Sequence, residues 1–327
     1  MVNPHHGSHF NKTPLSAYIN TIAEYVRASG MRRVVHVGPL MAPGGMSSVI
    51  KLLAANPPKG WRASSCNTYS RRSKLQKLRR WRIARNEIKN GDFDLVHIHC
   101  ASDWSYKRKL SIAKVANAPV IFHIHSGRFD IDTKSDLDNY HVVCLSQSWS
   151  ERLRPLVGDS ISVPNPVNPV PQERVEREEF TLLMGRNDPV KGHAFAYSLG
   201  LDDLRVTGVE NAPKGVTALG WVSEEEKWRL LQSARCLIVP SEYEGQPMVI
   251  LEALSVGCPV VASSNIPDLP DCVRVVDLDD KTGWKDAIAN PIIQGLEEAV
   301  AKHRVDIVSK QWGEIYDRII DSSASTE

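Results

Sequence analysis

Residues 236–262 read CLIVPSEYEGQPMVILEALSVGCPVVA, and their pattern decides the fold. The apolar run at 236–239 has the composition of a buried strand, and a Gly-Gln-Pro turn follows it. Residues 248–255 then read as an apolar helix, which leads to a second strand-like run at 259–262. A strand, a turn, a helix and another strand in this order are typical of a parallel sheet covered by helices.

Glu244 and Glu252, two of the three acids in this stretch, bracket the Gly-Gln-Pro turn and the start of the helix. In an open α/β sheet, ligands bind where a strand's carboxyl end meets a turn and a helix N-terminus. The N–H groups there attract phosphate, whereas acids there suit the hydroxyls of a ribose or a hexose. Either acid alone is well explained as a turn residue or a solvated helix residue. Because Glu252 has apolar neighbours, where an unpaired charge is costly, the two acids together favour a binding role.

The same alternation of strands and helices extends along the chain. Strands are expected at 33–38, 94–99, 119–125, 141–145 and 160–163, and again at 180–184, 204–206, 218–219, 236–239, 259–262 and 273–276. Helices are expected at 15–29, 47–54, 223–233 and 248–255 and through much of 283–320. A proline-rich linker is expected at 163–177. The sequence therefore predicts an α/β protein with Rossmann-like, doubly wound domains at 1–166 and 167–300 and a helical tail at 301–327.

The composition is ordinary for a soluble globular protein, with 42% hydrophobic and 24% charged residues among 327. A net charge of +2 gives no global attraction to nucleic acid. We find no apolar run of about 18 residues and no signal peptide, so a cytoplasmic location is expected. The six cysteines lack close pairing, which suits reduced, buried thiols: Cys66, Cys100, Cys144, Cys236, Cys258 and Cys272.

A second motif, MGRNDPVKG at 184–192, follows an expected strand. Arg186 offers a planar fork to phosphate oxygens, and Lys191 offers a mobile point charge. Such a pair can neutralise a departing diphosphate without a metal. On this loop alone, two solvated cations explain the pattern slightly better than a phosphate site does. Together with the two acids, the motif favours a phosphate-binding role.

In this order the motifs resemble those of retaining glycosyltransferases with the two-Rossmann GT-B fold, specifically glycosyltransferase family 4. The resemblance spans 34–276 and is densest at 185–263. It rests on the Gly-Arg and Lys-Gly loop, on LGWVS at 219–223 and on the Glu pair before GCPVVA. The resemblance implies two domains that face a central cleft, with the first domain on the acceptor side and the second holding a nucleotide sugar.

The resemblance also implies roles at the matching positions. Arg186 and Lys191 would hold the donor diphosphate, beside Gly185. Glu252 would accept from the ribose, and Trp221 and Val222 would flank the base. Glu244, with Gly245 and Gln246, would contact the donor sugar. In the first domain, His125 would lie beside the transferred sugar and Gly44 and Gly45 would face the donor phosphates and the acceptor, while Asn165 matches a hinge-side Pro-Asn motif.

The chain departs from the family's pattern at Gln246-Pro247, where Phe-Gly is commonest. Pro247 has no N–H to donate, which puts the number of backbone contacts to the sugar in doubt. Two other functions therefore stay open. One is a sugar-nucleotide epimerase on the same fold, and the other is a non-catalytic protein that binds a sugar nucleotide.

Histidines and aspartates raise the question of a metal. His97, His99, His123 and His125 have i, i+2 spacing on two expected strands, a set that zinc can use. Residues two apart share one face of a buried sheet, so packing accounts for most of them, and only His125 is a functional candidate. His5, His6 and His9 fall in a polar tail. The pairs Asp130 and Asp132, and Asp136 and Asp138, read as solvated loop residues. No metal and no other cofactor are expected.

Residues 71–89 carry nine cations against one acid, Glu87. The cations are Arg71, Arg72, Lys74, Lys77, Arg79, Arg80, Arg82, Arg85 and Lys89, and an apolar stripe is formed by Leu75, Leu78, Trp81, Ala84 and Ile88. Basic amphipathic helices favour anionic membrane surfaces, and nucleic acid is the weaker alternative. We expect an enzyme that moves a hexose to a carbohydrate or lipid-linked acceptor in polysaccharide or glycolipid biosynthesis, on the inner face of a membrane.

Overall fold

The computed structural model describes residues 30–42, 44–71, 73–101, 103–126, 133–168 and 175–324. The expected helix at 15–29, the histidines His5, His6 and His9, Arg72, the pair Asp130 and Asp132, and part of the expected linker lie outside these residues.

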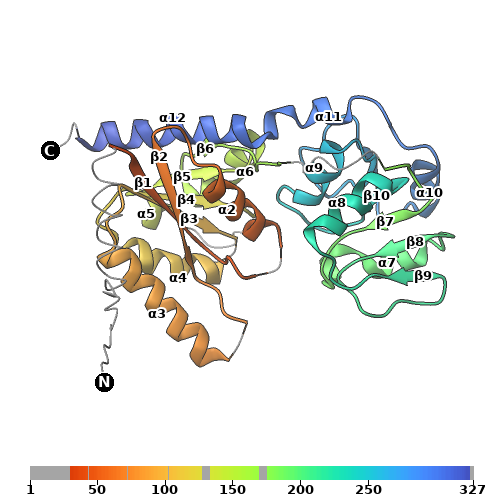
Figure 1. The fold of residues 1–327 in the computed structure, drawn as a ribbon, viewed down its shortest axis with the longest axis horizontal. Coiled ribbons are helices and arrows are strands. Elements are labelled where there is room, and N and C mark those ends of the chain that lie inside the picture. The colour runs from red at the N-terminus through yellow and green to blue at the C-terminus, as the bar shows by residue number, and fades with distance from the viewer. Residues whose placement is uncertain are drawn as a thin grey trace, which may run out of the picture.

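The first unit is built on a six-stranded parallel sheet of order β2-β1-β3-β4-β5-β6 (Figure 1). Its strands are β1 (Arg32–Gly38), β2 (Trp61–Asn67), β3 (Leu95–Cys100), β4 (Val120–Ile124), β5 (His141–Cys144) and β6 (Ile161–Ser162). Its helices are α2 (Gly45–Ala55), α3 (Lys74–Asn90), α4 (Asp103–Ala113), α5 (Lys134–Leu137) and α6 (Gln147–Val157). The central strands are buried along their length, as parallel strands covered by helices must be.

The second unit repeats this plan with the order β12-β11-β10-β7-β8-β9. Its strands are β7 (Thr181–Leu183), β8 (Leu204–Val206), β9 (Val216–Ala218), β10 (Cys236–Val239), β11 (Val260–Ser263) and β12 (Arg274–Val276). Its helices are α7 (His193–Ser198), α8 (Glu224–Ser233), α9 (Met248–Ser255), α10 (Lys281–Ala289) and α11 (Leu296–Ala299). The prediction of two Rossmann-like, doubly wound domains is confirmed.

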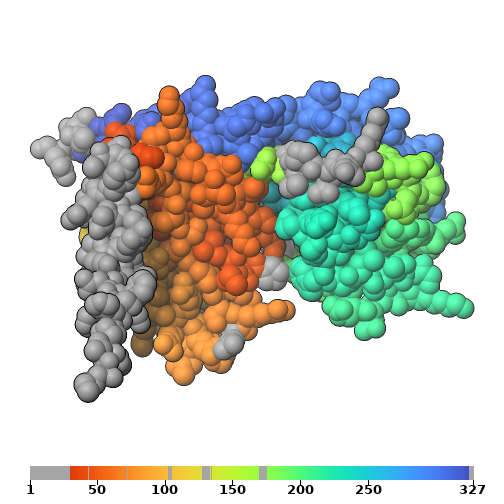
Figure 2. Space-filling model, in the orientation of Figure 1, coloured from red at the N-terminus to blue at the C-terminus, as the bar shows by residue number. Residues whose placement is uncertain are grey.

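The last helix, α12 (Val305–Ala324), runs back across the first unit (Figure 1). Its Trp312 and Tyr316 are buried against the first sheet, and Tyr316 packs edge-on against Trp61 of β2. Asp317 pairs with Arg32 at 2.8 Å. The chain therefore connects the two units twice, once between β6 and β7 and once between α11 and α12. Figure 2 shows a notch between the units on the side away from α12.

Strand order gives each sheet one topological switch point, where successive connections leave in opposite directions. In the first sheet it lies between β1 and β3, and in the second between β7 and β10. The crevice outside the carboxyl ends of the strands at a switch point is the usual ligand site of such sheets. Each unit therefore has one switch point at which such a crevice is expected.

Candidate active site

The predicted site residues of the first unit lie against those of the second. A Cβ added to Gly245 would be 2.7 Å from the carbonyl oxygen of His125. One added to Gly45 would be 3.0 Å from the side chain of Met248, and one added to Gly44 would be 3.9 Å from Arg186. These close approaches bring residues of the two units to one place.

Arg186, Lys191 and Glu244 come together at the β7–β10 switch point. Lys191 ends a short 3₁₀ turn (Pro189–Lys191) after β7, and Glu244 follows β10. The Lys191 ammonium donates to Glu244, whose Oε1 also accepts from the Ser241 hydroxyl at 2.9 Å. The carboxylate thus fixes the position of the lysine at the switch point.

Asp188 orients Arg186. Its carboxylate pairs with the Arg186 guanidinium at 2.8 Å and accepts from the Val190 N–H at 3.2 Å. Burial acts to raise the pKa of Asp188, but the Val190 N–H and the Arg186 guanidinium outweigh it, so the pKa lies below its usual value. The carboxylate is therefore ionised at neutral pH, and Arg186 stays half exposed at the crevice.

The turn that carries Lys191 depends on Gly192. Its φ of 73° is left-handed, and an added Cβ would overlap the carbonyl of Pro240, which directly follows β10. The backbones after β7 and β10 can approach each other only because residue 192 has no side chain. This approach brings Lys191 within reach of Glu244.

Glu252 lies on α9 and is buried, as its apolar neighbours indicated. Lys227 of α8 pairs with it at 2.8 Å, and the two side chains are only 13% and 10% exposed. Burial raises the pKa of Glu252, and the ammonium of Lys227 limits the rise. Sequence reasoning missed Lys227. Because an unpaired buried charge is costly, the apolar neighbours of Glu252 indicated that it has a cationic partner, but the sequence did not identify that cation.

Gln246 and Asn165 meet at the connection between the units. The side-chain oxygen of Gln246 accepts from the backbone N–H of Asn165 at 2.7 Å, and the backbone carbonyl of Gln246 accepts from the side-chain amide of Asn165 at 3.2 Å. His303, before α12, bonds to the Asn165 carbonyl at 2.9 Å. The structure thus places the Gln246 side chain on the hinge. Pro247 precedes α9 as its N-cap residue, a position that requires no N–H bond within the helix.

The remaining donor-side residues lie on loops around the same sheet. Trp221 and Val222 are in the connection between β9 and α8, and Trp221 is 58% exposed. The Gly185 N–H donates to the Thr207 hydroxyl at 3.1 Å. Trp149 of the first unit donates its indole N–H to the Gly245 carbonyl at 2.9 Å. Trp149 is a further residue at the contact that sequence reasoning missed.

The predicted histidines form one buried cluster, and His36 of β1 joins it. His36, His99 and His125 are linked in a row by ring nitrogens at 3.1 and 2.9 Å. His97 bonds to His123 at 3.2 Å and to the Tyr316 hydroxyl at 2.7 Å. Burial lowers the pKa of His36 to about 3, so neutral rings link to one another at physiological pH.

Each link of the row needs one ring N–H and one bare nitrogen, so the tautomers are coupled. If His99 donates to His125, the other ring nitrogen of His125 carries a proton; if His125 donates, that nitrogen is bare. In the described part of the chain, two triads bring donor atoms within 4.8 Å, as a metal would require: His36, His97 and His99, and His99, His123 and His125. Hydrogen bonds already account for most of these contacts.

All six cysteines are buried, and none is in a disulfide within the described residues. Burial raises the pKa of Cys258 to about 11 and that of Cys66 to about 12. These thiols are therefore protonated at neutral pH and act as small core residues.

The basic helix forms as α3, but its apolar stripe divides into two parts. Ala84 and Ile88 are buried against the first sheet, whereas Leu75 is 75% exposed and Leu78 is 42% exposed. Among the described residues, no helix has the length and apolar character needed to span a bilayer. The N-terminal half of α3 therefore offers apolar side chains among cations to the outside.

Comparison with known proteins agrees with this geometry. Residues 182–300 match a family model described as Glycosyl transferases group 1. O-antigen chain mannosyltransferase B from Escherichia coli is 41% identical over 80 residues, which are 24% of this chain and 21% of that protein. The chain thus matches about a fifth of that relative's length.

Solved structures match over nearly the whole chain. Sucrose-phosphate synthase from Thermosynechococcus elongatus has a TM-score of 0.69 at 18% identity, over 89% of this chain and 100% of that one. HepE from Anabaena, solved with UDP and glucose, has a TM-score of 0.68 at 13% identity, over 88% and 100% of the chains. The chain has the GT-B fold, and its second unit, from β7 to the end of α11, is similar to group 1 glycosyl transferases.

Proposed function

We propose that this protein is a retaining glycosyltransferase that moves a hexose from a nucleoside-diphosphate sugar to an acceptor hydroxyl. The observation that carries the proposal is the convergence of Arg186, Lys191 and Glu244 at the β7–β10 switch point, opposite His125. The match of 182–300 to group 1 glycosyl transferases supports the same class. The E. coli relative, a mannosyltransferase of O-antigen chains, favours a role in surface polysaccharide or glycolipid biosynthesis.

The donor is held by charge at one end and by hydroxyl contacts at the other. Arg186 and Lys191 bind the diphosphate and stabilise it as it leaves, which is the charge that a metal would otherwise supply. Glu252, which pairs with the Lys227 ammonium, accepts from the ribose hydroxyls, and Trp221 covers the base. Glu244 accepts from hydroxyls of the sugar while it orients Lys191.

Retention follows from attack on the face that the diphosphate leaves. The bond between the anomeric carbon and the phosphate oxygen breaks, and its electron pair goes to the diphosphate. The acceptor oxygen bonds to the same face of that carbon, and its proton passes to the departing phosphate oxygen. The Glu244 carboxylate is held by Lys191 and Ser241, which supports a contact role in place of a nucleophilic one.

The test replaces the two cations separately. A thermal-shift screen across nucleoside-diphosphate sugars identifies the donor first. Arg186→Ala and Lys191→Ala should then each lower turnover about 100-fold, as removal of one transition-state contact does. Asn187→Ala, an exposed change on the same loop, is the matched control. Near-normal rates in both cation variants would refute the assignment, and conversion of labelled donor without an acceptor would indicate an epimerase.

We also propose that α3 attaches the protein to an anionic membrane surface. Seven cations lie along α3, which also carries the exposed Leu75 and Leu78, and each cation near such a surface contributes about 1 kcal/mol. In a flotation assay, the protein should float with vesicles that contain phosphatidylglycerol and not with phosphatidylcholine alone. Equal binding to both vesicles would contradict the proposal.

A further inference from the structure

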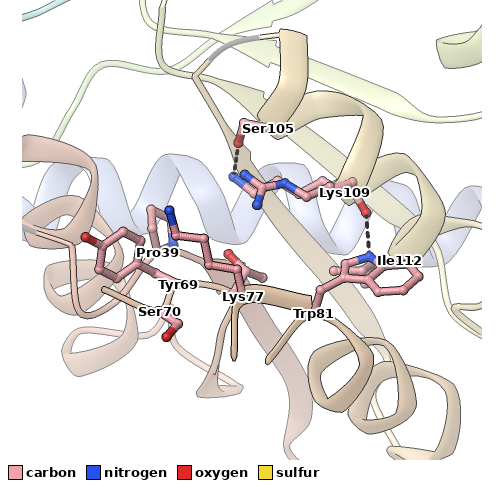
Figure 3. A pocket seen from close by; sticks show the side chains of 10 residues that line it. Pro39, Tyr69, Ser70, Lys77, Trp81, Ser105, Lys109 and Ile112 are labelled. Carbon is pink, nitrogen blue, oxygen red and sulfur yellow. Dashed lines mark hydrogen bonds between the residues drawn. The ribbon is translucent and has the colours of Figure 1, made fainter. Parts of the chain in front are cut away.

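The first sheet has its own crevice at the β1–β3 switch point. It is a pocket of about 140 Å³ between α3 and α4, named here the α3–α4 pocket (Figure 3). Pro39 after β1 and Tyr69 and Ser70 after β2 form one end, and α4 follows β3 on the other side. The pocket therefore lies where a Rossmann-like sheet normally binds a ligand, in the unit opposite the candidate donor site.

Three cations line the α3–α4 pocket: Lys77 of α3, and Arg108 and Lys109 of α4. Among the described side chains that line it, none is acidic, and the polar remainder are hydroxyls such as those of Ser70 and Ser105. Figure 3 shows Lys77 between Tyr69 and Trp81, with Ser105 and Lys109 above them. The charge of this pocket is thus of one sign, unlike the paired charges of the donor site.

Lys109 is buried at 4% exposure. Its ammonium donates to the His99 carbonyl and to the Ser105 hydroxyl at 2.9 Å, which uses two of its three protons. No carboxylate of the described residues pairs with it. Burial lowers the pKa of Lys109, which reflects the cost of a buried ammonium without an anion. A bound anion would supply the missing partner.

The walls of the pocket are fixed before any ligand arrives. The Trp81 indole N–H donates to the Ser111 hydroxyl at 3.0 Å, which ties α3 to α4. Arg80 donates to the Asn67 carbonyl at 2.7 Å, which ties α3 to the end of β2. A preformed site loses less conformational entropy when it binds.

From these observations we propose that the α3–α4 pocket binds a phosphate or diphosphate group carried by the acceptor. The proposal rests on the proposed transferase function and adds the chemical class of its acceptor. Three cations suit a group with more than one negative charge better than a carboxylate, and hydroxyls add hydrogen bonds to its oxygens. Exposed Leu75 and Leu78 lie on the same helix as Lys77, so an apolar chain attached to the phosphate would have a surface to follow.

Pyrophosphate is the probe, and equilibrium dialysis of the radiolabelled ion is the measurement. Because Arg186 and Lys191 also attract pyrophosphate, the titration is made in the Arg186→Ala/Lys191→Ala variant. Adding Lys77→Gln and Arg108→Gln, both exposed side chains, should weaken binding about tenfold. Adding Lys74→Gln and Arg82→Gln, an equal charge loss on exposed positions outside the pocket, should leave binding within about twofold. Equal binding in the two sets would overturn the proposal.

A second arm identifies where the phosphate group comes from. If the acceptor is lipid-linked, phosphatidylcholine vesicles that contain phosphatidic acid should displace pyrophosphate from the pocket. If it is a soluble phosphorylated sugar, a sugar phosphate should displace it and the vesicles should not. Vesicles of phosphatidylcholine alone are the blank. If neither the phosphatidic acid vesicles nor the sugar phosphate displaces pyrophosphate, the pocket does not bind the phosphate group of an acceptor. Failure of the transferase function itself would appear separately, as unchanged donor binding in Arg186→Ala/Lys191→Ala.

Discussion

Replacing Lys227 with Met should strongly destabilise the second unit. The change keeps an unbranched side chain but leaves Glu252 as a buried charge without a partner, because the pair is only 13% and 10% exposed. Removing one member of a buried ion pair costs about 3–5 kcal/mol. The Lys227 ammonium also lies 4.7 Å from the Trp228 ring, a contact worth about 0.5–1 kcal/mol. Together these predict a loss of about 3.5–6 kcal/mol in the free energy of unfolding at pH 7.5.

The loss should shrink in acid, and it should be reversed by a second change. Burial already raises the pKa of Glu252, so without Lys227 this carboxyl binds a proton more readily folded than unfolded. A raised folded pKa contributes stability below the unfolded value and loses it as pH rises through the folded value, so the variant recovers as pH falls. Lys227→Met/Glu252→Leu should unfold within about 1 kcal/mol of the wild type. Urea titrations at pH 7.5 and 4.5 make the comparison, and a pH-independent loss that the double variant does not restore would refute the reasoning.

Three further changes test the fold around the site. Gly192→Ala should lower the free energy of unfolding in urea by more than about 2 kcal/mol, because strain at φ 73° adds to overlap with the Pro240 carbonyl. In the control Gly200→Ala, at φ 60°, the added Cβ meets no atom within 4 Å, so the loss should be only about 1 kcal/mol. Similar losses in the two variants would contradict this prediction. Buried His36, with its pKa of about 3, should make stability fall by about 1.4 kcal/mol per pH unit below 6.5, and His36→Leu should reduce the measured slope by that amount; an unchanged slope would count against it. Tyr316→Phe should lower the free energy of unfolding by about 1 kcal/mol, because His97 loses a 2.7 Å hydrogen bond. The melting temperature should fall as a result, and an unchanged melting temperature would show that this bond does not contribute to stability.

Local pattern was sufficient for the central strands of both sheets and for three of their four edge strands, β6, β9 and β12, and it failed only at the edge strand β2. The helix expected at 248–255 matches α9, because its turn and its apolar run both mark the boundary. Strand β2 (Trp61–Asn67) pairs with β1 alone, and it was missed because most of its residues are polar. Its strand conformation is decided by pairing and by the burial of Trp61 and Cys66, which involve distant segments.

The sequence predicted which residues belong to the site but not which residues contact one another there. Motif order brought Arg186, Lys191 and Glu244 into one hypothesis, and the structure places them together. Which cation lies beside Glu252, and where Gln246 points, depend on how α8 packs on α9 and how Asn165 is placed. Contacts between segments far apart in the chain leave no local pattern, so Lys227 and His36 were found only in the fold.

The two crevices differ in how their charges are balanced, and this difference bears on what each can bind. At the β7–β10 switch point each cation already has a carboxylate, Asp188 for Arg186 and Glu244 for Lys191. A ligand there must offer hydroxyls to the acids as well as phosphates to the cations, because an anion alone would leave a carboxylate facing a like charge. In the α3–α4 pocket the described lining holds cations and hydroxyls without an acid, so a phosphate group there meets no such opposition. The β7–β10 switch point therefore suits a molecule with both sugar and diphosphate, and the α3–α4 pocket suits the phosphate or diphosphate group of an acceptor.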